Sequence, residues 1–189
     1  WQNLFGEGIV ATPDDFGNMG QAPTHPELVD YLANRLIASG WSLKAVQREI
    51  ALSRAYRQSS LNPEKSVIER DPANLALTRA RVRRIEAEAI RDAMLAVSGR
   101  LVERGGGRGT APYLTPFMVG RGRPGGSGPV DGDGRRSIYQ NIRRNFLNPF
   151  LLVFDSPVPF STIGRRSASN VPAQALALLN NPFVLDQAN

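Results

Sequence analysis

Cysteine is absent from this 189-residue chain, and histidine occurs once, as His25. Without cysteine there can be no disulfide, no thiolate nucleophile, no zinc–thiolate site and no covalent haem attachment. A single histidine excludes any metal site built from several histidines. Lysine is almost absent too, since Lys44 and Lys65 are the only lysines among 23 basic residues. Arginine therefore supplies nearly all of the positive charge, and its planar, weakly hydrated guanidinium favours buried ion pairs with carboxylates.

Long apolar runs are also missing. No stretch of about 18 apolar residues occurs, so we predict no membrane span. The chain opens on WQNLFGEG, with no initiator methionine and no charged-then-apolar leader. We expect it to be a fragment of a longer protein. Its length suits one hydrophobic core, which predicts a single domain over residues 1–189.

Two helices are predicted in the first third of the chain. The first is expected to start with Thr24 as N-cap and Glu27 completing a capping box, and to stop at Gly40. The second is expected to start at Ser42. Trp41, between them, is expected to fill the corner where the two helices meet.

Further helices are predicted downstream. A strongly periodic segment covers about residues 83–98, with Gly99 as its stop, and residues 172–179 form another helix that the Asn180-Asn181-Pro182 sequence breaks. Residues 137–145 are consistent with either a strand or a short helix. The fold class that follows is mainly α: an irregular helical domain with long loops and little or no β-sheet. The buried stripe of the 83–98 helix is expected to consist of Ile85, Ala89, Met94 and Val97.

Glycine is concentrated in one stretch. Eleven of the 18 glycines lie between Gly105 and Gly134. This composition predicts a flexible insertion at about residues 103–134. It contains GGGRG but no GxxxxGK[ST] pattern, so a phosphate-binding loop is not expected.

Asp14, Asp15 and His25 are the candidates for catalysis. Two carboxylates and an imidazole could bind a metal or share acid–base work. The competing interpretation is structural, because a histidine at a helix start and aspartates after a proline suit caps and turns. His25 could also serve with Met19 as an axial haem ligand. We predict no metal site from these residues.

A second candidate set surrounds Asp155, which follows apolar residues and should need a positive partner. Two hypotheses remain open. The arginines could form a structural cluster that ties the last third of the chain to the helix bearing Glu86 and Asp92, or they could line a pocket for an anion or an acidic glycan. The candidate partners of Asp155 are Arg143, Arg144, Arg165 and Arg166. Arginine pairs beside aromatic residues could also suggest nucleic acid, but interspersed acidic residues argue against it.

Several sequence segments together resemble a known family. WQNLFGEGIVATPDDFG, PTHPELVDYLA, SGWSLKAVQREIALSRAYRQSS, RVRRIEAEAIRDAMLAVSGRL, RRSIYQNIRRN and PAQALALLNNPFV occur in that order. They are similar to the planctomycete cytochrome-associated C-terminal domain of unknown function, number fifteen-fifty-three. The resemblance covers nearly the whole chain apart from the Gly-rich stretch.

The resemblance implies an exported protein, in the periplasm or at the cell surface. It also implies a separate upstream domain carrying haem c, while this chain itself needs no cofactor. Two functions follow as hypotheses. The first is an accessory or interaction module that contacts upstream domains of the same protein and, as further candidate partners, a polysaccharide or an anionic ligand. The second is a hydrolase-like or carbohydrate-active domain that uses Asp14, Asp15 and His25.

Overall fold

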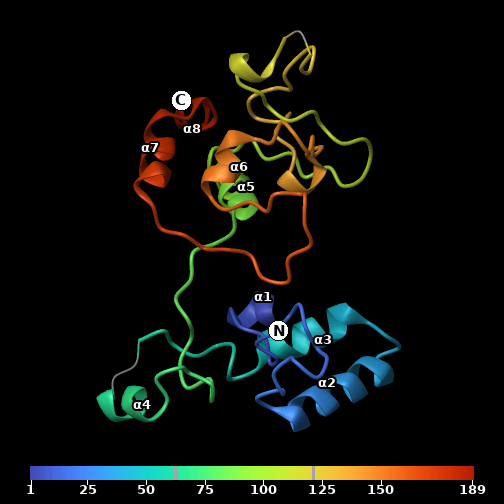
Figure 1. Ribbon diagram of the computed structural model, residues 1–189, viewed down its shortest axis with the longest axis vertical. Helices are drawn as coiled ribbons and strands as arrows, with labels where there is room; N and C mark the ends of the chain where they lie inside the picture. The colour runs from blue at the N-terminus through green and yellow to red at the C-terminus, as the bar shows by residue number, and fades with distance from the viewer. Residues whose placement is uncertain (62–63, 121) are drawn as a thin grey trace. The chain divides into compact units, whose positions relative to one another are not determined.

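The structure is a computed structural model that describes residues 1–61, 64–120 and 122–189 (Figure 1). In this part of the chain there is no sheet, and two isolated parallel bridges join Val102 to Arg135 and Thr110 to Gln140. The prediction of a mainly α fold is confirmed. None of the described helices has both the length and the apolar character needed to cross a membrane. The elements are α1 (Gln2–Phe5), α2 (Pro26–Ala38), α3 (Leu43–Leu52), α4 (Lys65–Arg70), α5 (Ala87–Val97), η1 (Pro116–Met118), η2 (Ser137–Tyr139), α6 (Pro149–Val153), α7 (Pro172–Asn180) and α8 (Pro182–Ala188), where η marks a 3₁₀ helix.

Internal contacts divide the chain into two compact units, Trp1–Arg83 and Arg84–Asn189. The first contains α1 to α4, and the second contains α5 to α8 with both 3₁₀ helices. That the whole chain forms one domain stays a prediction, as does its being a fragment of a longer protein.

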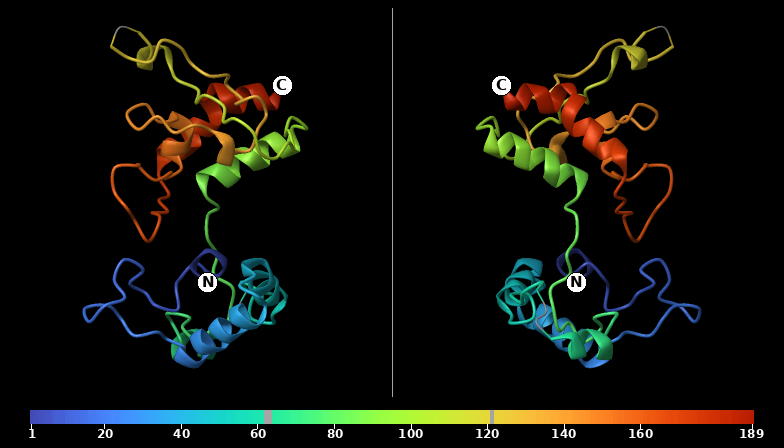
Figure 2. Two further views of the ribbon diagram at one scale, coloured as in Figure 1. Left: turned by 90° about the vertical axis from the view of Figure 1, so that its right-hand side faces the viewer. Right: turned by 90° about the vertical axis from the view of Figure 1, so that its left-hand side faces the viewer.

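In the first unit, α2 packs against α3 (Figure 2). The start of α3 is as predicted, because the Ser42 hydroxyl accepts a hydrogen bond from the Ala45 amide. The predicted cap of α2 is wrong: His25 is the N-cap residue and caps no amide with its side chain. The Thr24 hydroxyl donates instead to the Ile9 carbonyl at 3.2 Å, which holds the entering chain rather than the helix.

The corner between α2 and α3 differs from the prediction in the position of the Trp41 side chain. Gly40 follows the C-cap with φ at +65°, and Trp41 adopts a left-handed φ of +64° as well. The Trp41 side chain is 71% exposed and so does not fill the corner. A left-handed conformation is unfavourable for a residue with a Cβ atom, so this corner stores backbone strain.

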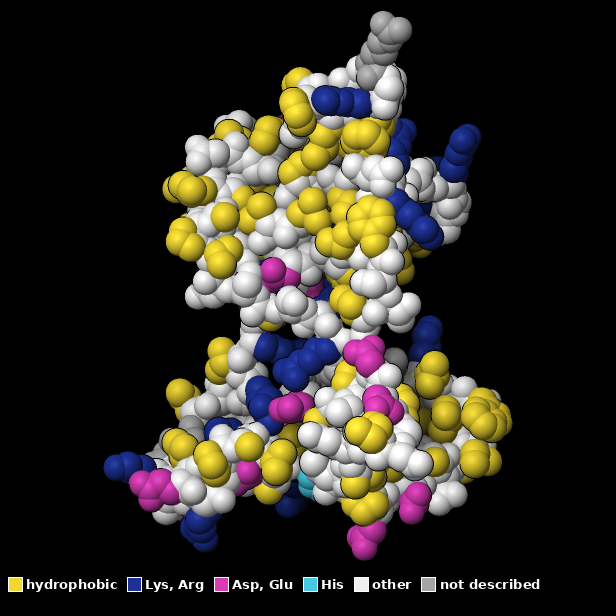
Figure 3. Space-filling model, viewed as in Figure 1, with side chains coloured by type: hydrophobic (Ala, Val, Ile, Leu, Met, Phe, Trp, Pro, Cys, Tyr) yellow, Lys and Arg dark blue, Asp and Glu magenta, His cyan; other side chains and the backbone are white. Residues whose placement is uncertain are grey.

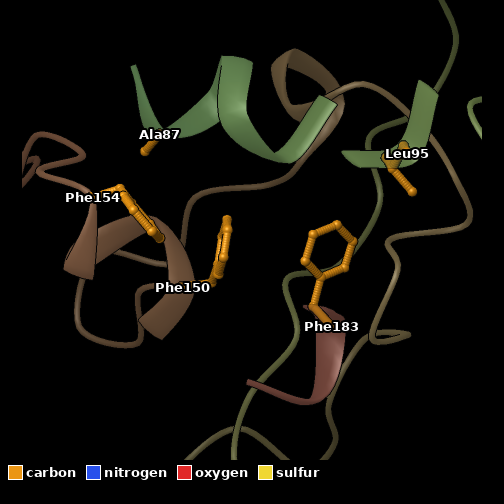
Figure 4. Close-up of a cluster of buried hydrophobic side chains, with 5 residues drawn as sticks. All are labelled: Ala87, Leu95, Phe150, Phe154 and Phe183. Atoms are coloured by element: carbon orange, nitrogen blue, oxygen red, sulfur yellow. The ribbon is translucent and has the colours of Figure 1, made fainter. Parts of the chain in front are cut away.

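The core of the second unit is aromatic (Figure 4). The ring of Phe150 from α6 lies between Phe154, 5.0 Å away, and Phe183 from α8, 5.4 Å away. Ala87 and Leu95 from α5 complete the buried cluster. Helix α5 accordingly contacts both α6 and α8 within this unit.

Helix α5 buries a different face from the predicted one. Its buried residues are Ala87, Arg91 and Leu95, whereas Ile85 and Val97 are exposed. The helical period was correct and Gly99 ends the helix with φ at +73°, as predicted. The face was wrong because Arg91, counted as polar surface, is buried.

One three-residue sequence builds two helix starts in this core. In Asn148-Pro149-Phe150 and Asn181-Pro182-Phe183, the asparagine side chain accepts a hydrogen bond from the phenylalanine amide, at 2.9 and 3.0 Å. Proline occupies the first helical position, where it has no amide hydrogen to satisfy. Each phenylalanine is thereby directed into the core. The sequence prediction missed α6, although the same pattern marks α8.

The Gly-rich stretch is tied to the second unit at several points; Arg121 lies outside the described residues. Arg135 donates to the Gly106 and Arg108 carbonyl oxygens, both at 2.5 Å. The Tyr139 hydroxyl accepts from the Gly106 amide. The flexibility of this stretch stays a prediction. In the following segment, the short-helix alternative is correct at Ser137–Tyr139, which forms η2.

Candidate functional site

A cavity of about 490 Å³ lies in the second unit, bounded by residues of α5, η2 and α6 and of the connections around them. Its volume falls in the range of small-molecule sites. Hydroxyl, amide and aliphatic side chains line it beside charged ones. Arg143 and Arg166 of the predicted arginine cluster face this cavity, whereas Arg144, Asp155 and Arg165 do not line it. The charged lining residues are Glu86, Glu88, Asp92, Arg136, Arg143 and Arg166.

Asp92 fastens η2 to α5 at the cavity wall. Its Oδ1 accepts hydrogen bonds from the amide and from the hydroxyl of Ser137, both at 2.7 Å. Arg136 Nε lies 3.5 Å from Asp92 Oδ2. Because Ser137 is buried, these bonds satisfy groups that would otherwise be costly to remove from water.

Arg91 lies behind Asp92 and is only 1% exposed. Its guanidinium donates to the carbonyl oxygens of Asp131 at 2.6 Å and Arg135 at 2.9 Å, and to the Ser137 hydroxyl at 3.1 Å. Burial lowers the pKa of Arg91, and the charges of Asp92 and Asp131 oppose this shift. Arginine nevertheless stays charged at neutral pH. Arg91 thus joins the end of the Gly-rich stretch to α5.

Arg166 joins the connection before α7 to the start of α5. Its Nη1 lies 2.7 Å from Glu88 Oε2 and 3.2 Å from Glu86 Oε2. Partial burial acts to lower the pKa of Arg166, but the hydrogen bond to Glu88 and the two negative charges outweigh it and raise that pKa. Two carboxylates therefore share one guanidinium at this edge of the cavity.

The other three predicted arginines differ in their surroundings. Arg143 is partly buried and donates one long hydrogen bond, at 3.5 Å, to the Gly126 carbonyl. Arg144 and Arg165 are exposed. The structure therefore gives adjacent arginines, Arg143 and Arg144, different positions relative to the cavity.

Asp155 lies outside the cavity and has Arg84 as its ion-pair partner, at 2.5 Å. Its carboxylate also accepts from the Ser169 amide at 2.7 Å and from the Ser169 hydroxyl at 2.9 Å. The Ser169 amide is the main cause that lowers the pKa of Asp155, helped by the Ser169 hydroxyl and the charge of Arg84, while desolvation acts in the opposite direction. The Arg84 guanidinium also donates to the Phe154 carbonyl. These contacts hold the loop that follows α6 in place.

Of the three catalytic candidates of the first unit, Asp14 and Asp15 lie at a turn, and His25 is the N-cap residue of α2. Asp15 Oδ1 accepts from the Gly17 amide at 2.8 Å, and Asp14 is exposed. His25 Nδ1 lies 2.9 Å from the Thr24 hydroxyl. His25 lines a cavity of only about 20 Å³, whose lining includes neither Asp14 nor Asp15. That volume holds about one water molecule.

Sequence reasoning missed the residues that organise the second unit: Arg84, Arg91, Ser137 and Ser169. A signal existed for Arg91, because it lies at i+4 from Ala87 and i−4 from Leu95 and so shares their helix face. The serines carried no comparable signal, since their partners are distant in the sequence. The cavity offers positively charged hydrogen-bond donors and negatively charged acceptors beside an aliphatic surface.

No group of three or more His, Cys, Asp or Glu residues that could hold a metal ion occurs within residues 1–61, 64–120 and 122–189. In a comparison with protein families, the family described as PSD1, protein of unknown function (DUF1553), matches residues 1–189. No curated protein and no solved structure matches the chain.

Proposed function

We propose that the chain, which belongs over its whole length to the PSD1 family of proteins of unknown function (DUF1553), is an accessory interaction module rather than an independent catalyst. In this proposal it forms the C-terminal part of an exported, planctomycete-type protein whose upstream region carries a haem c domain. The upstream link and the export rest on the resemblance of the sequence segments given above. The interaction role rests on the surface of the chain.

The observation that carries the interaction role is the apolar surface of α7. This helix, PAQALALLN, contains no charged residue, yet Leu176 is 59% exposed and Leu179 is 68% exposed. The two leucines are three residues apart and therefore lie on the same face. An uncharged and largely apolar helix is normally buried. We infer that another part of the parent protein covers this face.

The rest of the surface is also rich in apolar side chains. Hydrophobic groups lie exposed on both units on the side seen in Figure 3. Among the described residues, more large hydrophobic side chains are exposed than are buried in the core. Isolated exposed apolar residues are common, but a contiguous apolar surface is typical of interaction sites.

The ion pairs of the second unit support the same function. The guanidinium groups of Arg84, Arg91 and Arg166 each bind carboxylates or carbonyl oxygens of distant segments. These bonds hold the long connecting segments against the helices. The loops therefore form a defined surface. Preorganised surfaces bind with a smaller loss of conformational entropy.

The test is association with the upstream part of the parent protein, supplied as a separate polypeptide. We expect the Leu176→Asp/Leu179→Asp variant to weaken this association at least about a hundredfold, because each buried leucine contributes roughly 1.5–3 kcal/mol and the two together at least about 3 kcal/mol. Met19→Asp, at a more exposed apolar residue of the first unit, should leave it unchanged. Isothermal titration calorimetry measures the affinity. The proposal fails if the wild-type chain does not associate and the amides of α7 exchange equally fast in the chain alone and in the parent.

A further inference from the structure

The charges that line the cavity of the second unit balance. Three carboxylates, of Glu86, Glu88 and Asp92, face three guanidinium groups, of Arg136, Arg143 and Arg166. A lining of one sign would attract ligands of the opposite sign, whereas a balanced lining does not. Nucleotides and other polyanions would meet the carboxylates as well as the arginines. The cavity is therefore suited to a polar ligand without a large net charge.

Some of the charged side chains do not use their full hydrogen-bonding capacity on one another. Arg143 makes one long hydrogen bond within the described residues, at 3.5 Å to the Gly126 carbonyl, and Arg136 lies 3.5 Å from Asp92. Glu86 shares Arg166 with Glu88. Arg136, Arg143 and Glu86 thus have unused hydrogen-bonding capacity toward a ligand.

Neutral groups extend this polar lining. Asn141 and Ser156 add a carboxamide and a hydroxyl, each able to donate and to accept. Hydroxyl groups of a ligand also donate and accept, so they match a lining that contains carboxylates, carboxamides and guanidinium groups together. Pairs of adjacent hydroxyls fit the two-pronged geometry of these planar side chains.

The aliphatic side of the cavity is open to solvent. Ile138 is 77% exposed and Ile142 is 72% exposed, and both line the cavity beside Phe146. An apolar surface next to planar polar groups suits a ligand with both C–H faces and hydroxyl edges. A pyranose ring has this combination.

The common modes of peptide recognition fit less well. Adding a strand requires an exposed sheet edge, and the described residues contain only isolated bridges. Docking a helix requires an apolar groove, whereas six charged side chains line this cavity. An arginine cluster for acidic motifs would be opposed by Glu86, Glu88 and Asp92.

We propose that this cavity binds a neutral oligosaccharide. Glu86, Asn141 and Arg143 hydrogen-bond its hydroxyl groups, and Ile138, Ile142 and Phe146 pack against its C–H faces. This site is separate from the apolar face of α7, and its test does not depend on the interaction module proposed above.

The experiment titrates the 189-residue chain with neutral trisaccharides built from glucose, xylose, mannose, galactose or N-acetylglucosamine. Trigalacturonate and inorganic phosphate serve as acidic probes. Saturation-transfer NMR detects binding, and calorimetry gives the affinity. We expect at least one neutral trisaccharide to bind with a millimolar or lower Kd. Arg143→Ala should weaken it by about tenfold to a hundredfold, the range for losing a hydrogen bond to a charged group.

Arg144→Ala is the matched control, because Arg144 is adjacent in sequence, exposed and outside the cavity lining. It should leave the affinity unchanged. Asn141→Ala provides a second test if Arg143→Ala fails to fold by circular dichroism. Three results would overturn the proposal: no neutral trisaccharide binds, the substitutions at 143 and 144 have equal effects, or trigalacturonate or phosphate binds more tightly than every neutral sugar. The last result would identify an anion site instead.

Discussion

The surroundings of Asp155 explain why a carboxylate is tolerated after the apolar run of α6. Its backbone is left-handed, with φ at +62°, which aspartate and asparagine adopt more readily than other residues with a Cβ atom. Its oxygens accept from both donors of Ser169 and pair with Arg84. The need for a positive partner follows from the sequence. The identity of that partner does not, because Arg84 lies 71 residues away.

These contacts predict a pH-dependent contribution to stability. Because the Ser169 amide lowers the pKa of Asp155 in the folded state, the folded chain binds this proton less tightly than the unfolded chain does. The contribution is therefore fully present above the unfolded pKa of about 3.9. It is lost as the pH falls through the lower, folded pKa.

Asp155→Asn isolates this effect, since asparagine retains the size and tolerates the left-handed backbone. At neutral pH we expect the substitution to lower the free energy of unfolding by about 1–2 kcal/mol. The difference from wild type should stay constant down to about pH 4 and shrink below it. Urea denaturation at a series of pH values measures it. A difference that stays constant below pH 4 would show that the charge of Asp155 is not responsible.

At the scale of elements, periodicity and breaker residues predicted the longer helices. Ser42 starts α3 and Gly99 ends α5 because caps and C-terminal glycines depend on local sequence. The buried face of α5 was wrong because hydropathy places arginine at the surface. Arg91 is buried only because the carbonyl oxygens of distant segments accept its hydrogen bonds.

Even less of the candidate cavity than of the helices could be predicted from the sequence. Arg143 and Arg166 were candidates from the sequence, and both line it. Glu88, Ser137 and Asn141 come to the same place through the contacts of η2 with α5 and through the Thr110–Gln140 bridge. Such long-range pairing leaves no periodic signal in a single sequence.

The repeated Asn-Pro-Phe sequence gives a prediction for elements α6 and α8. Asn181→Ala removes the side chain that accepts from the Phe183 amide, and we expect the free energy of unfolding to fall by about 1 kcal/mol. Asn148→Ala should have a similar effect through the Phe150 amide. Asn180→Ala is the matched control: its side chain is exposed and caps no helix start, so its effect should stay within about 0.5 kcal/mol. Chemical denaturation compares the three, and an equal loss at 180 and 181 would contradict the capping role.

At the scale of the whole molecule, the division into two units bears on how the chain unfolds. The second unit depends on Arg91, which joins α5 to the end of the Gly-rich stretch and to the residue that follows it. Methionine has a similar length but cannot satisfy the Asp131 and Arg135 carbonyl oxygens, and it leaves Asp92 without one of its positive neighbours. Removing one partner from a buried polar network costs about 3 kcal/mol or more.

Hydrogen exchange of the Arg91→Met variant therefore reports how far cooperativity extends along the chain. Contacts are concentrated within each unit, and regions of this kind often open as separate cooperative units. We expect amides of α5, α6 and α8 to exchange faster in the variant, while those of α2 and α3 keep their wild-type rates. Arg100→Met, which breaks the exposed ion pair with Asp186, should change neither set. If α2 and α3 accelerate together with α5, the two units unfold together, as expected for the single domain that the sequence predicts.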